Sequence, residues 1–208
     1  MPVFVEPRVS NPVRQKFESY LRSAMAYCSA RGLELRFEAV GLTDRGIVTT
    51  EGGPRDGFRF GYSLVPTGTE VPDPWGVGDL VYAALGDSVW NTADRDVEER
   101  DDCFVLRLRD RNDPKKVHVC EVSVAMRDEE GSFVIRRRDQ TNGACGFHVV
   151  EGIAGFDGMV AALHPEEKPS KAVRRACLKA MTEDPGKCTA VVYAEVVRDL
   201  YANMGVDA

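Results

Sequence analysis

The fold of this chain is decided by the segment CFVLRLRDRNDPKKVHVCEVSVAMRDEEGSFVIRRRDQTNGACGFHVV, residues 103–150. Apolar and polar side chains alternate along it with the period of two that is typical of half-buried strands. Turn-forming residues separate the alternating runs. The pattern predicts an antiparallel meander of four strands. It indicates an architecture rather than a chemistry, because no set of nucleophile, base and metal ligands stands out along it.

Residue parity assigns the side chains of the meander to faces. The core face takes the alternate apolar residues of the first two strands: Phe104, Leu106, Leu108, Cys120, Val122, Val124 and Met126. In the second strand the opposite set is also partly apolar, which predicts a central strand covered on both sides. A four-residue loop at 128–131 sets Met126 opposite Phe133 and Val124 opposite Ile135. Cys103 then faces away from Cys120, so we expect no disulfide between them.

The same parity places four arginines on the face opposite the core, with Glu121 between them. They are Arg107 and Arg109 on the first strand, and Arg136 and Arg138 on the third. One interpretation of this face is a solvated sheet surface that neutralises part of its own charge. The other is a surface that docks an acidic partner, such as a second copy of this chain. Trp75 and Trp90 complete the candidate interaction residues, because aromatic side chains that a core cannot bury anchor interfaces.

Composition is that of an ordinary globular protein. The 208 residues are 43% hydrophobic and 29% charged, enough for one sizeable core or two modest ones. No run approaches the roughly 20 apolar residues of a membrane helix, and the N-terminus lacks the features of a secretory signal. We therefore expect cytoplasmic synthesis and no membrane partner. The net charge of −6 argues against a general affinity for nucleic acid.

Residues 1–93 are predicted to form an α-β-β-β-α unit. A first helix begins at Asn11-Pro12 and stops at Gly32, and Asp79 caps a second helix. Between them lie strands near residues 33–39, 47–50 and 58–64. This order is similar to that of double-stranded RNA binding domains. Those domains carry a lysine cluster where this chain reads DPWGVGD at 73–79, so RNA binding is not expected.

The rest of the chain completes an α+β fold. Residues 94–102 are densely charged and are predicted to be a solvated connection. Residues 103–208 carry the meander and then helices that start near Asp157, Pro169 and Thr189. The last two helices are predicted to form a hairpin that covers one face of the sheet. The halves 1–93 and 103–208 are either separate domains or share one core.

Two candidate sites contain cysteine and histidine. Gly143-Ala144-Cys145-Gly146 is similar to the sequence around the nucleophile of chymotrypsin-like viral cysteine proteases. On an extended strand His148 faces away from Cys145, however, and His118 belongs to the same meander, so neither is placed as its base. A zinc site made of His118, Cys120, Cys145 and His148 matches no established spacing. We assign no catalytic residue, metal or cofactor.

The chain contains six cysteines without paired CxxC spacing: Cys28, Cys103, Cys120, Cys145, Cys177 and Cys188. The simpler interpretation is buried thiols, since free cysteine packs like a small hydrophobic residue. Cross-linking in an assembly that meets oxidising surroundings is the alternative.

Three classes of function remain. The first, which we predict, is a non-enzymatic assembly protein that works by self-association or by docking another protein, for example as a virion, phage neck or tail component. Its helix and strand order is loosely similar to that of phage tail-terminator and neck-ring subunits. The second is an enzyme whose site combines scattered carboxylates with the loop at 66–75. The third is an adaptor that docks an acidic partner through the arginine face.

Overall fold

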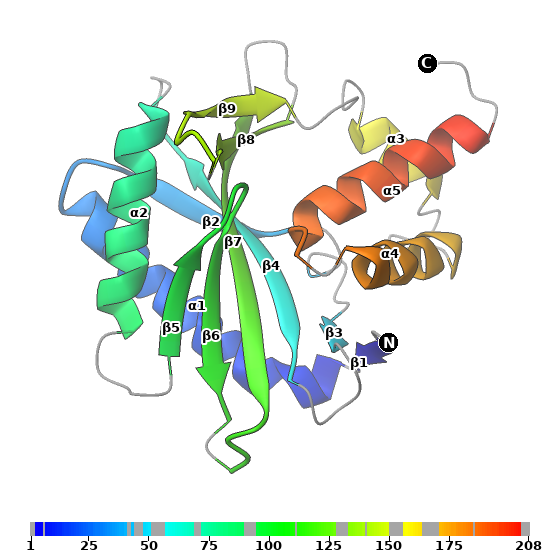
Figure 1. Cartoon of the computed structure of the whole chain (residues 1–208), viewed down its shortest axis with the longest axis horizontal. Coiled ribbons are helices and arrows are strands. Elements are labelled where there is room, and N and C mark those ends of the chain that lie inside the picture. Colours follow the sequence, from blue (N-terminus) through cyan, green and yellow to red (C-terminus); the bar gives the residue numbers. More distant parts are fainter. Residues whose placement is uncertain are drawn as a thin grey trace.

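The computed structural model describes residues 3–5, 7–40, 43, 48–50, 57–68, 72–89, 95–110, 112–127, 133–139, 141–149, 156–163, 171–184 and 186–204. Within these residues the chain forms five helices and one nine-stranded sheet (Figure 1). The expected α+β class is confirmed. None of the described helices combines the length and hydropathy that crossing a membrane requires.

The sheet joins strands from both ends of the chain. Its main path runs through β1 (Val3–Val5), β3 (Val48–Thr50), β4 (Arg59–Pro66), β7 (Val117–Arg127), β6 (Phe104–Arg109) and β5 (Arg95–Glu99). β2 (Leu35–Ala39) also pairs with β4, and β8 (Phe133–Arg138) and β9 (Cys145–Val149) extend from the far end of β7. β4 and β7 are parallel, and every other pair is antiparallel. β4 precedes the 94–102 segment and β7 follows it, so their pairing joins both parts of the chain in one sheet.

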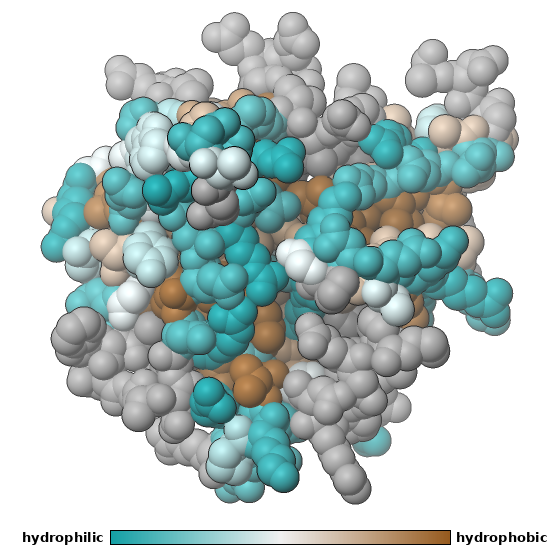
Figure 2. Space-filling view, in the orientation of Figure 1, coloured by the Kyte–Doolittle hydropathy of each residue, from teal (hydrophilic) through white to brown (hydrophobic). Residues whose placement is uncertain are grey.

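Helices cover both faces of this sheet. α1 (Pro7–Ser29) and α2 (Pro74–Val89) bury the main core against the apolar face of β4, β6 and β7. α3 (Phe156–Leu163), α4 (Lys171–Glu183) and α5 (Thr189–Asn203) form a layer at the other side (Figure 1) and bury mostly one another. Figure 2 shows apolar side chains gathered between α4 and α5, with hydrophilic ones over their outer surfaces. Among the described residues, the apolar contacts of α5 with the sheet come from its first turns.

The main features of the meander agree with the alternation of its sequence. β6, β7, β8 and β9 pair in succession, and each pair is antiparallel. Phe104, Leu106 and Leu108 lie in the main core with Val122 and Val124. β7 is covered on both sides, as the apolar residues on both of its faces indicated. Cys103 and Cys120 lie in different clusters on opposite faces, and all six cysteines are free.

The predicted register between β7 and β8 was wrong by one residue. Ala125 pairs with Ile135 and Met126 with Val134. Arg127 and Phe133 form the last pair, so five residues, 128–132, separate the paired ends and not four. A slip of one residue sends every side chain of a strand to the other face. Ile135 consequently packs on Ala125 under α5, and Arg136 and Arg138 turn toward α2.

Three element boundaries also differ from the predicted ones. The charged segment 94–102 contains β5, because its acidic side chains pair with arginines across the β5–β6 hairpin rather than with solvent alone. α1 begins at Pro7 and runs through Pro12. α2 begins at Pro74 rather than near Asp79, because the Asp73 carboxylate accepts a hydrogen bond from the Gly76 amide at 2.6 Å and caps the helix there.

The helical hairpin at the C-terminus is present, but it covers less of the sheet than predicted. α4 and α5 pack together around Cys177, Met181 and Val197. Cys188 and Ala190, at the beginning of α5, contact Cys103 and Val105 on the sheet. The rest of α5 extends away from the strands (Figure 1). This arrangement brings the connection between α4 and α5 to the polar face of the sheet.

Candidate functional site

A row of polar residues is buried where the first turn of α5 meets the sheet. We call it the buried polar row: Arg59, Gly61 and Ser63 on β4, and Glu121 and Ser123 on β7. β4 and β7 are parallel neighbours in which Gly61 aligns with Glu121 and Ser63 with Ser123. The intervening residues of both strands point into the apolar core. The buried polar row therefore lies on the face of these strands opposite the main apolar core.

Glu121 is the centre of this row. Its carboxylate is 1% exposed and forms an ion pair with Arg59, whose Nε lies 2.9 Å from Oε1. Oε2 accepts hydrogen bonds from the amide and the hydroxyl of Thr189, both at 2.7 Å. Arg59 also donates to the carbonyl of Lys187 at 2.8 Å. The pair thereby fixes the beginning of α5 to the two central strands. The interpretation of the face around Glu121 as a solvated surface was therefore wrong.

The other members of the row are paired just as closely. The hydroxyls of Ser63 and Ser123 lie 2.7 Å apart, and the Gly61 amide donates to Oγ1 of Thr43 at 2.7 Å. A Cβ at Gly61 would come within 2.6 Å of the Thr189 hydroxyl. Position 61 accordingly needs glycine for the close approach of α5. Buried polar groups that are all bonded in this way hold one arrangement of helix and sheet.

Beside the row lies a pocket of about 880 Å³. It opens between the β5–β6 turn, the β8–β9 hairpin and the connection from α4 to α5. Its lining is rich in charged residues: Glu98, Glu99, Arg100, Asp101, Asp102, Ile135, Arg137, His148, Asp184, Gly186, Lys187, Val191 and Glu195. The loop at 66–75, suggested as part of an enzyme site, contributes none of these residues.

Ion pairs fix most of the charges around the pocket. Glu98 pairs with Arg107 and Arg100, and this holds the pKa of its carboxyl below the ordinary value. Nζ of Lys187 lies 2.6 Å from the carboxylate of Glu195. Arg137 and His148 are exposed, and neither forms an ion pair with another residue that the structure describes. Arg137 is thus the arginine of the pocket that is best placed to meet an anionic ligand.

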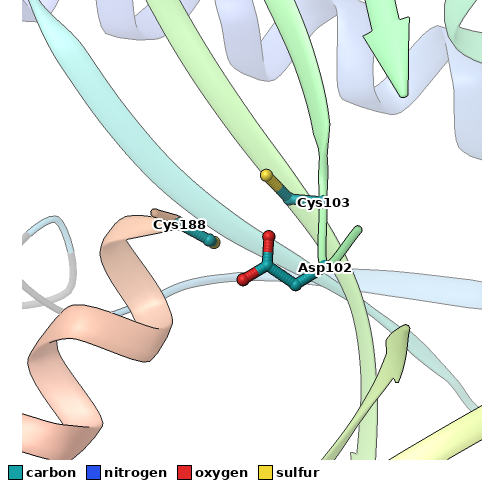
Figure 3. Close-up of side chains that lie close together, drawn as sticks. All are labelled: Asp102, Cys103 and Cys188. Atoms are coloured by element: carbon teal, nitrogen blue, oxygen red, sulfur yellow. The ribbon is translucent and has the colours of Figure 1, made fainter. Parts of the chain in front are cut away.

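Asp102 connects the pocket to a pair of cysteines (Figure 3). It lies in the β5–β6 turn, next to Cys103 and across from Cys188 at the beginning of α5. One ligand atom of each of these three residues lies within 4.8 Å of the others. Burial and the nearby charge of Glu121 raise the pKa of the Asp102 carboxyl. The hydrogen bond between the Cys103 and Cys188 thiols, together with burial, raises the pKa of the Cys103 thiol.

The carboxylates of the site do not form a cage for magnesium. Two-metal enzymes of phosphoryl transfer hold Mg²⁺ through clustered carboxylates and substrate phosphates. Among the described residues, the one group of three metal-ligating side chains within reach of a common ion is Asp102, Cys103 and Cys188. Thiolates are poor ligands for Mg²⁺. Glu121 is already bonded to Arg59 and Thr189. A pair of magnesium ions therefore does not fit these residues.

The four arginines predicted to share one face lie on two. Arg107 pairs with Asp96 and Glu98, and Arg109 is exposed near the end of β6. Arg136 is 4% exposed, donates to the carbonyl of Pro74 at 2.7 Å and pairs with Glu99. Arg138 also pairs with Glu99, and its guanidinium lies 4.7 Å from the ring centre of Trp75. The register of β8 explains the separation.

Some of the predicted interaction residues are accessible and some are not. Trp75 is 39% exposed despite its contact with Arg138. Arg136 is enclosed so tightly that a Cβ at Gly78 of α2 would lie 2.1 Å from its guanidinium. Trp90 lies outside the described residues. The docking role of Arg107, Arg109, Arg136, Arg138, Trp75 and Trp90, and self-association with it, stays a prediction.

The cysteine and histidine candidates are dispersed. The Cys145 thiol lies 3.5 Å from the carbonyl of Pro74, and no histidine among the described residues is bonded to it. His118 accepts a hydrogen bond from the Phe58 amide at 3.1 Å and contacts Asp110 at 3.4 Å. Cys120 is fully buried in the core. Neither the protease arrangement nor the zinc set His118, Cys120, Cys145 and His148 is assembled.

Sequence reasoning missed the residues that the structure brings together. The alternation Arg59, Gly61, Ser63 against Phe60, Tyr62, Leu64 marked β4 as a strand with a polar face. It did not show that this face is buried, because solvent-facing strands have the same pattern. Cys103 and Cys188 are 85 positions apart, a spacing that matches no local metal motif. Only the tertiary contact of α5 with the sheet reveals both features.

Comparison with known proteins identifies the fold of this chain through solved structures alone. No protein-family model matches the chain, and no curated protein matches it in sequence. Among solved structures, it is similar to the CD-NTase CdnG of Bradyrhizobium diazoefficiens in complex with GTP, with a TM-score of 0.52 and 15% identity, over 88% of this chain and 50% of that one. It is also similar to Vibrio cholerae DncV in its 3'-deoxy ATP bound form, with a TM-score of 0.53 and 12% identity, over 85% and 47%.

A second DncV structure, a cyclic AMP-GMP synthase in complex with a linear intermediate, has a TM-score of 0.51 and 14% identity, over 73% of this chain and 40% of that one. The chain spans about half the length of the solved structures it matches. At these identities the likeness establishes a fold of the DncV type.

These neighbours contradict the predicted non-enzymatic assembly function. They are synthases and nucleotide-bound enzymes rather than virion, phage neck or tail subunits. The same neighbours contradict the expectation that an enzyme is the less favoured class for this chain. That expectation rested on the absence of a readable catalytic set, and the residues around the pocket come from segments distant in the sequence. The alternative of an enzyme whose site cannot be read from the sequence agrees better with the fold.

Proposed function

We propose that this chain is part of a nucleotide-handling enzyme and that it binds a nucleoside triphosphate in the pocket beside the buried polar row. The observation that carries the proposal is the position of this pocket, between the sheet and the C-terminal helices of a fold that holds GTP and 3'-deoxy ATP in two of its structural neighbours.

The dimensions of the pocket suit such a ligand. Its volume of about 880 Å³ lies within the roughly 300–1,000 Å³ of small-molecule and cofactor sites. Its walls belong to elements that the ion pair of Glu121 and Arg59 and the β5–β6 pairing hold in place. A rigid wall limits the entropy lost when a ligand binds.

The charges of the pocket suggest how a nucleotide lies in it. Arg137, an exposed arginine, is the group suited to bidentate contact with a phosphate. Lys187 and His148 also line the pocket. Asp101 and Asp184, which line it too, suit ribose hydroxyls or the amino groups of a base, because carboxylates accept hydrogen bonds from both.

Calorimetric titration with ATP and with GTP tests the proposal directly. We expect saturable binding of at least one of them at equimolar stoichiometry. Arg137→Ala should weaken it about 10-fold or more, since a hydrogen bond to a charged group contributes roughly 1.5–3 kcal/mol. Arg109→Ala is the matched control, because Arg109 is also exposed on a strand but lies outside the pocket. Absence of binding at millimolar nucleotide, or equal weakening in both variants, would contradict the proposal.

Turnover is tested separately from binding. The chain is incubated with ATP and GTP together, in the presence of Mg²⁺ or Mn²⁺, and release of pyrophosphate is followed. Product formation that Arg137→Ala removes and Arg109→Ala retains would support an enzyme that acts at this pocket. Nucleotide that binds and is recovered unchanged would restrict the role of these residues to binding.

A further inference from the structure

Three metal-ligating side chains converge beside the pocket, which one of them, Asp102, also lines, and none of them has a function in the proposed nucleotide binding. Asp102 and Cys103 come from the β5–β6 turn, where the amide of Arg100 donates to the carbonyl of Cys103 at 2.8 Å. This bend lets two consecutive side chains point to the same side, which a straight strand would forbid. Cys188 approaches from the beginning of α5, as Figure 3 shows.

We propose that Asp102, Cys103 and Cys188 form a zinc site that links the β5–β6 turn to α5. The proposal is independent of nucleotide binding. Zinc takes sulfur ligands at about 2.3 Å and carboxylate oxygens at about 2.0–2.2 Å, so neighbouring ligands of a tetrahedral ion lie roughly 3.3–3.8 Å apart. The three donor atoms already lie within 4.8 Å of one another. Small rotamer changes bring them to these distances.

The donor set selects the class of metal. Two sulfurs and one carboxylate suit zinc and other thiophilic divalent ions, and they exclude magnesium and calcium, which prefer oxygen ligands alone. The cysteines are 4% and 2% exposed, as ligands of a bound zinc usually are. Asp102 reaches the pocket wall, which gives the ion a path of entry. Three protein ligands leave a fourth position for water on the side of the pocket.

The charge of the donors also suits a divalent ion. Zinc binding displaces the protons of thiol ligands, so Cys103 and Cys188 would bind the ion as thiolates together with the carboxylate of Asp102. The bound dication would hold α5 on the sheet beside the bonds that Thr189 makes with Glu121.

Zinc titration of the reduced, metal-stripped chain tests the proposal. A chromophoric chelator competes for the metal, and we expect one zinc per chain. Cobalt(II) should replace it and give the intense absorption of tetrahedral cobalt together with a thiolate charge-transfer band. Zinc should also raise the melting temperature. If the wild-type chain cannot take zinc from the chelator, the proposal is overturned by this measurement alone.

Serine variants then identify the ligands. Cys188→Ser and Cys103→Ser should each weaken zinc binding by more than the roughly 10–100-fold that loss of an outer partner costs. Asp102→Asn, which keeps the shape of the side chain, should weaken binding and leave the thiolate band of cobalt in place. Cys177→Ser is the matched control, since Cys177 is equally buried but lies between α4 and α5.

Two further outcomes would overturn the assignment. One is zinc bound equally well by the Cys103, Cys188 and Cys177 variants, which would locate the metal elsewhere. The other is a Cys103–Cys188 disulfide in the isolated chain, found by peptide mapping, with no zinc bound after reduction. Circular dichroism of each metal-free variant separates loss of zinc from loss of fold.

Discussion

The two faces of β7 differ in almost every respect. One face carries Cys120, Val122 and Val124, which pack against α1 and α2 in the main core. The other carries Glu121 and Ser123, which are buried as deeply but bonded to Arg59, Ser63 and α5. The apolar face is stabilised by burial alone and tolerates some change of shape. The polar face requires each of its partners, because an unbonded polar group there is costly.

This difference explains where the pocket lies. The pocket and the proposed zinc ligands both adjoin the polar face. On this face, ion pairs and hydrogen bonds hold α5 on the sheet, and part of the space beside them stays open as the pocket. The apolar face is packed by α1 and α2 and gives the strands their position. One side of the sheet thus fixes the fold, and the other presents the groups available for chemistry.

The largest effect is expected on the apolar face. Val124→Asp places a carboxylate at a position that is 1% exposed, among apolar side chains and without a partner. Its cost of several kcal/mol approaches the roughly 5–15 kcal/mol that stabilises a typical domain. We therefore expect no soluble folded chain, measured by expression yield and circular dichroism. A folded variant with a small loss of stability would show that this face is not the core.

A nearly equal effect is expected on the polar face. Glu121→Ala leaves Arg59 buried without its carboxylate and should destabilise the chain by about 3–5 kcal/mol in urea unfolding. Replacement of both partners by apolar residues, Arg59→Met with Glu121→Leu, should recover much of this loss. Glu98→Ala is the control, since this ion pair is partly exposed and its loss should cost less than about 1 kcal/mol. Equal effects of Glu121→Ala and Glu98→Ala would refute the buried pair.

A smaller effect is expected at the serines of the same face. Ser63→Ala leaves the buried hydroxyl of Ser123 without its 2.7 Å partner, at a cost of about 1–3 kcal/mol. The double variant with Ser123→Ala should be less destabilised than the sum of the single variants, because it leaves no unpaired hydroxyl. Thermal unfolding of the three variants measures the coupling. Strict additivity would mean that the two hydroxyls do not interact.

The smallest effect is a dependence on pH at the edge of the core. Burial lowers the pKa of His118 in the folded chain, although Asp110 opposes this shift. As pH falls below about 6.5, the unfolded chain takes up a proton that the folded chain still excludes, so stability decreases. His118→Asn should reduce the difference in urea midpoint between pH 7.5 and pH 5.5. A larger difference in the variant would mean that His118 is protonated in the fold.

The sequence was sufficient for the meander because alternation records burial on one face. Phe104, Leu106 and Leu108 could be assigned to the core for this reason. The register of β8 could not, since a loop of four residues and one of five are equally compatible with the residues at 128–132, and the choice reverses both faces of the strand. This error of one residue in the register of β8 is the reason that all four arginines were predicted to share one face.

The site was beyond sequence reasoning for a different physical reason. Glu121 and Arg59 have the pattern of surface residues, and only α5 makes them interior. Asp102, Cys103 and Cys188 meet through the same contact, between segments 85 positions apart. Long-range packing leaves no periodic signal in one sequence. The charged segment 94–102 was read as a linker because its ion-pair partners lie on another strand.

Hydrogen–deuterium exchange with and without saturating nucleoside triphosphate tests the central claim most directly, because it locates the ligand on one side of the sheet. We predict slower exchange at residues 98–102, 135–137 and 184–191, which surround the pocket, and unchanged exchange in α1 on the opposite face. Protection confined to α1 and α2, or no protection at any segment under saturating ATP and GTP, would contradict the account.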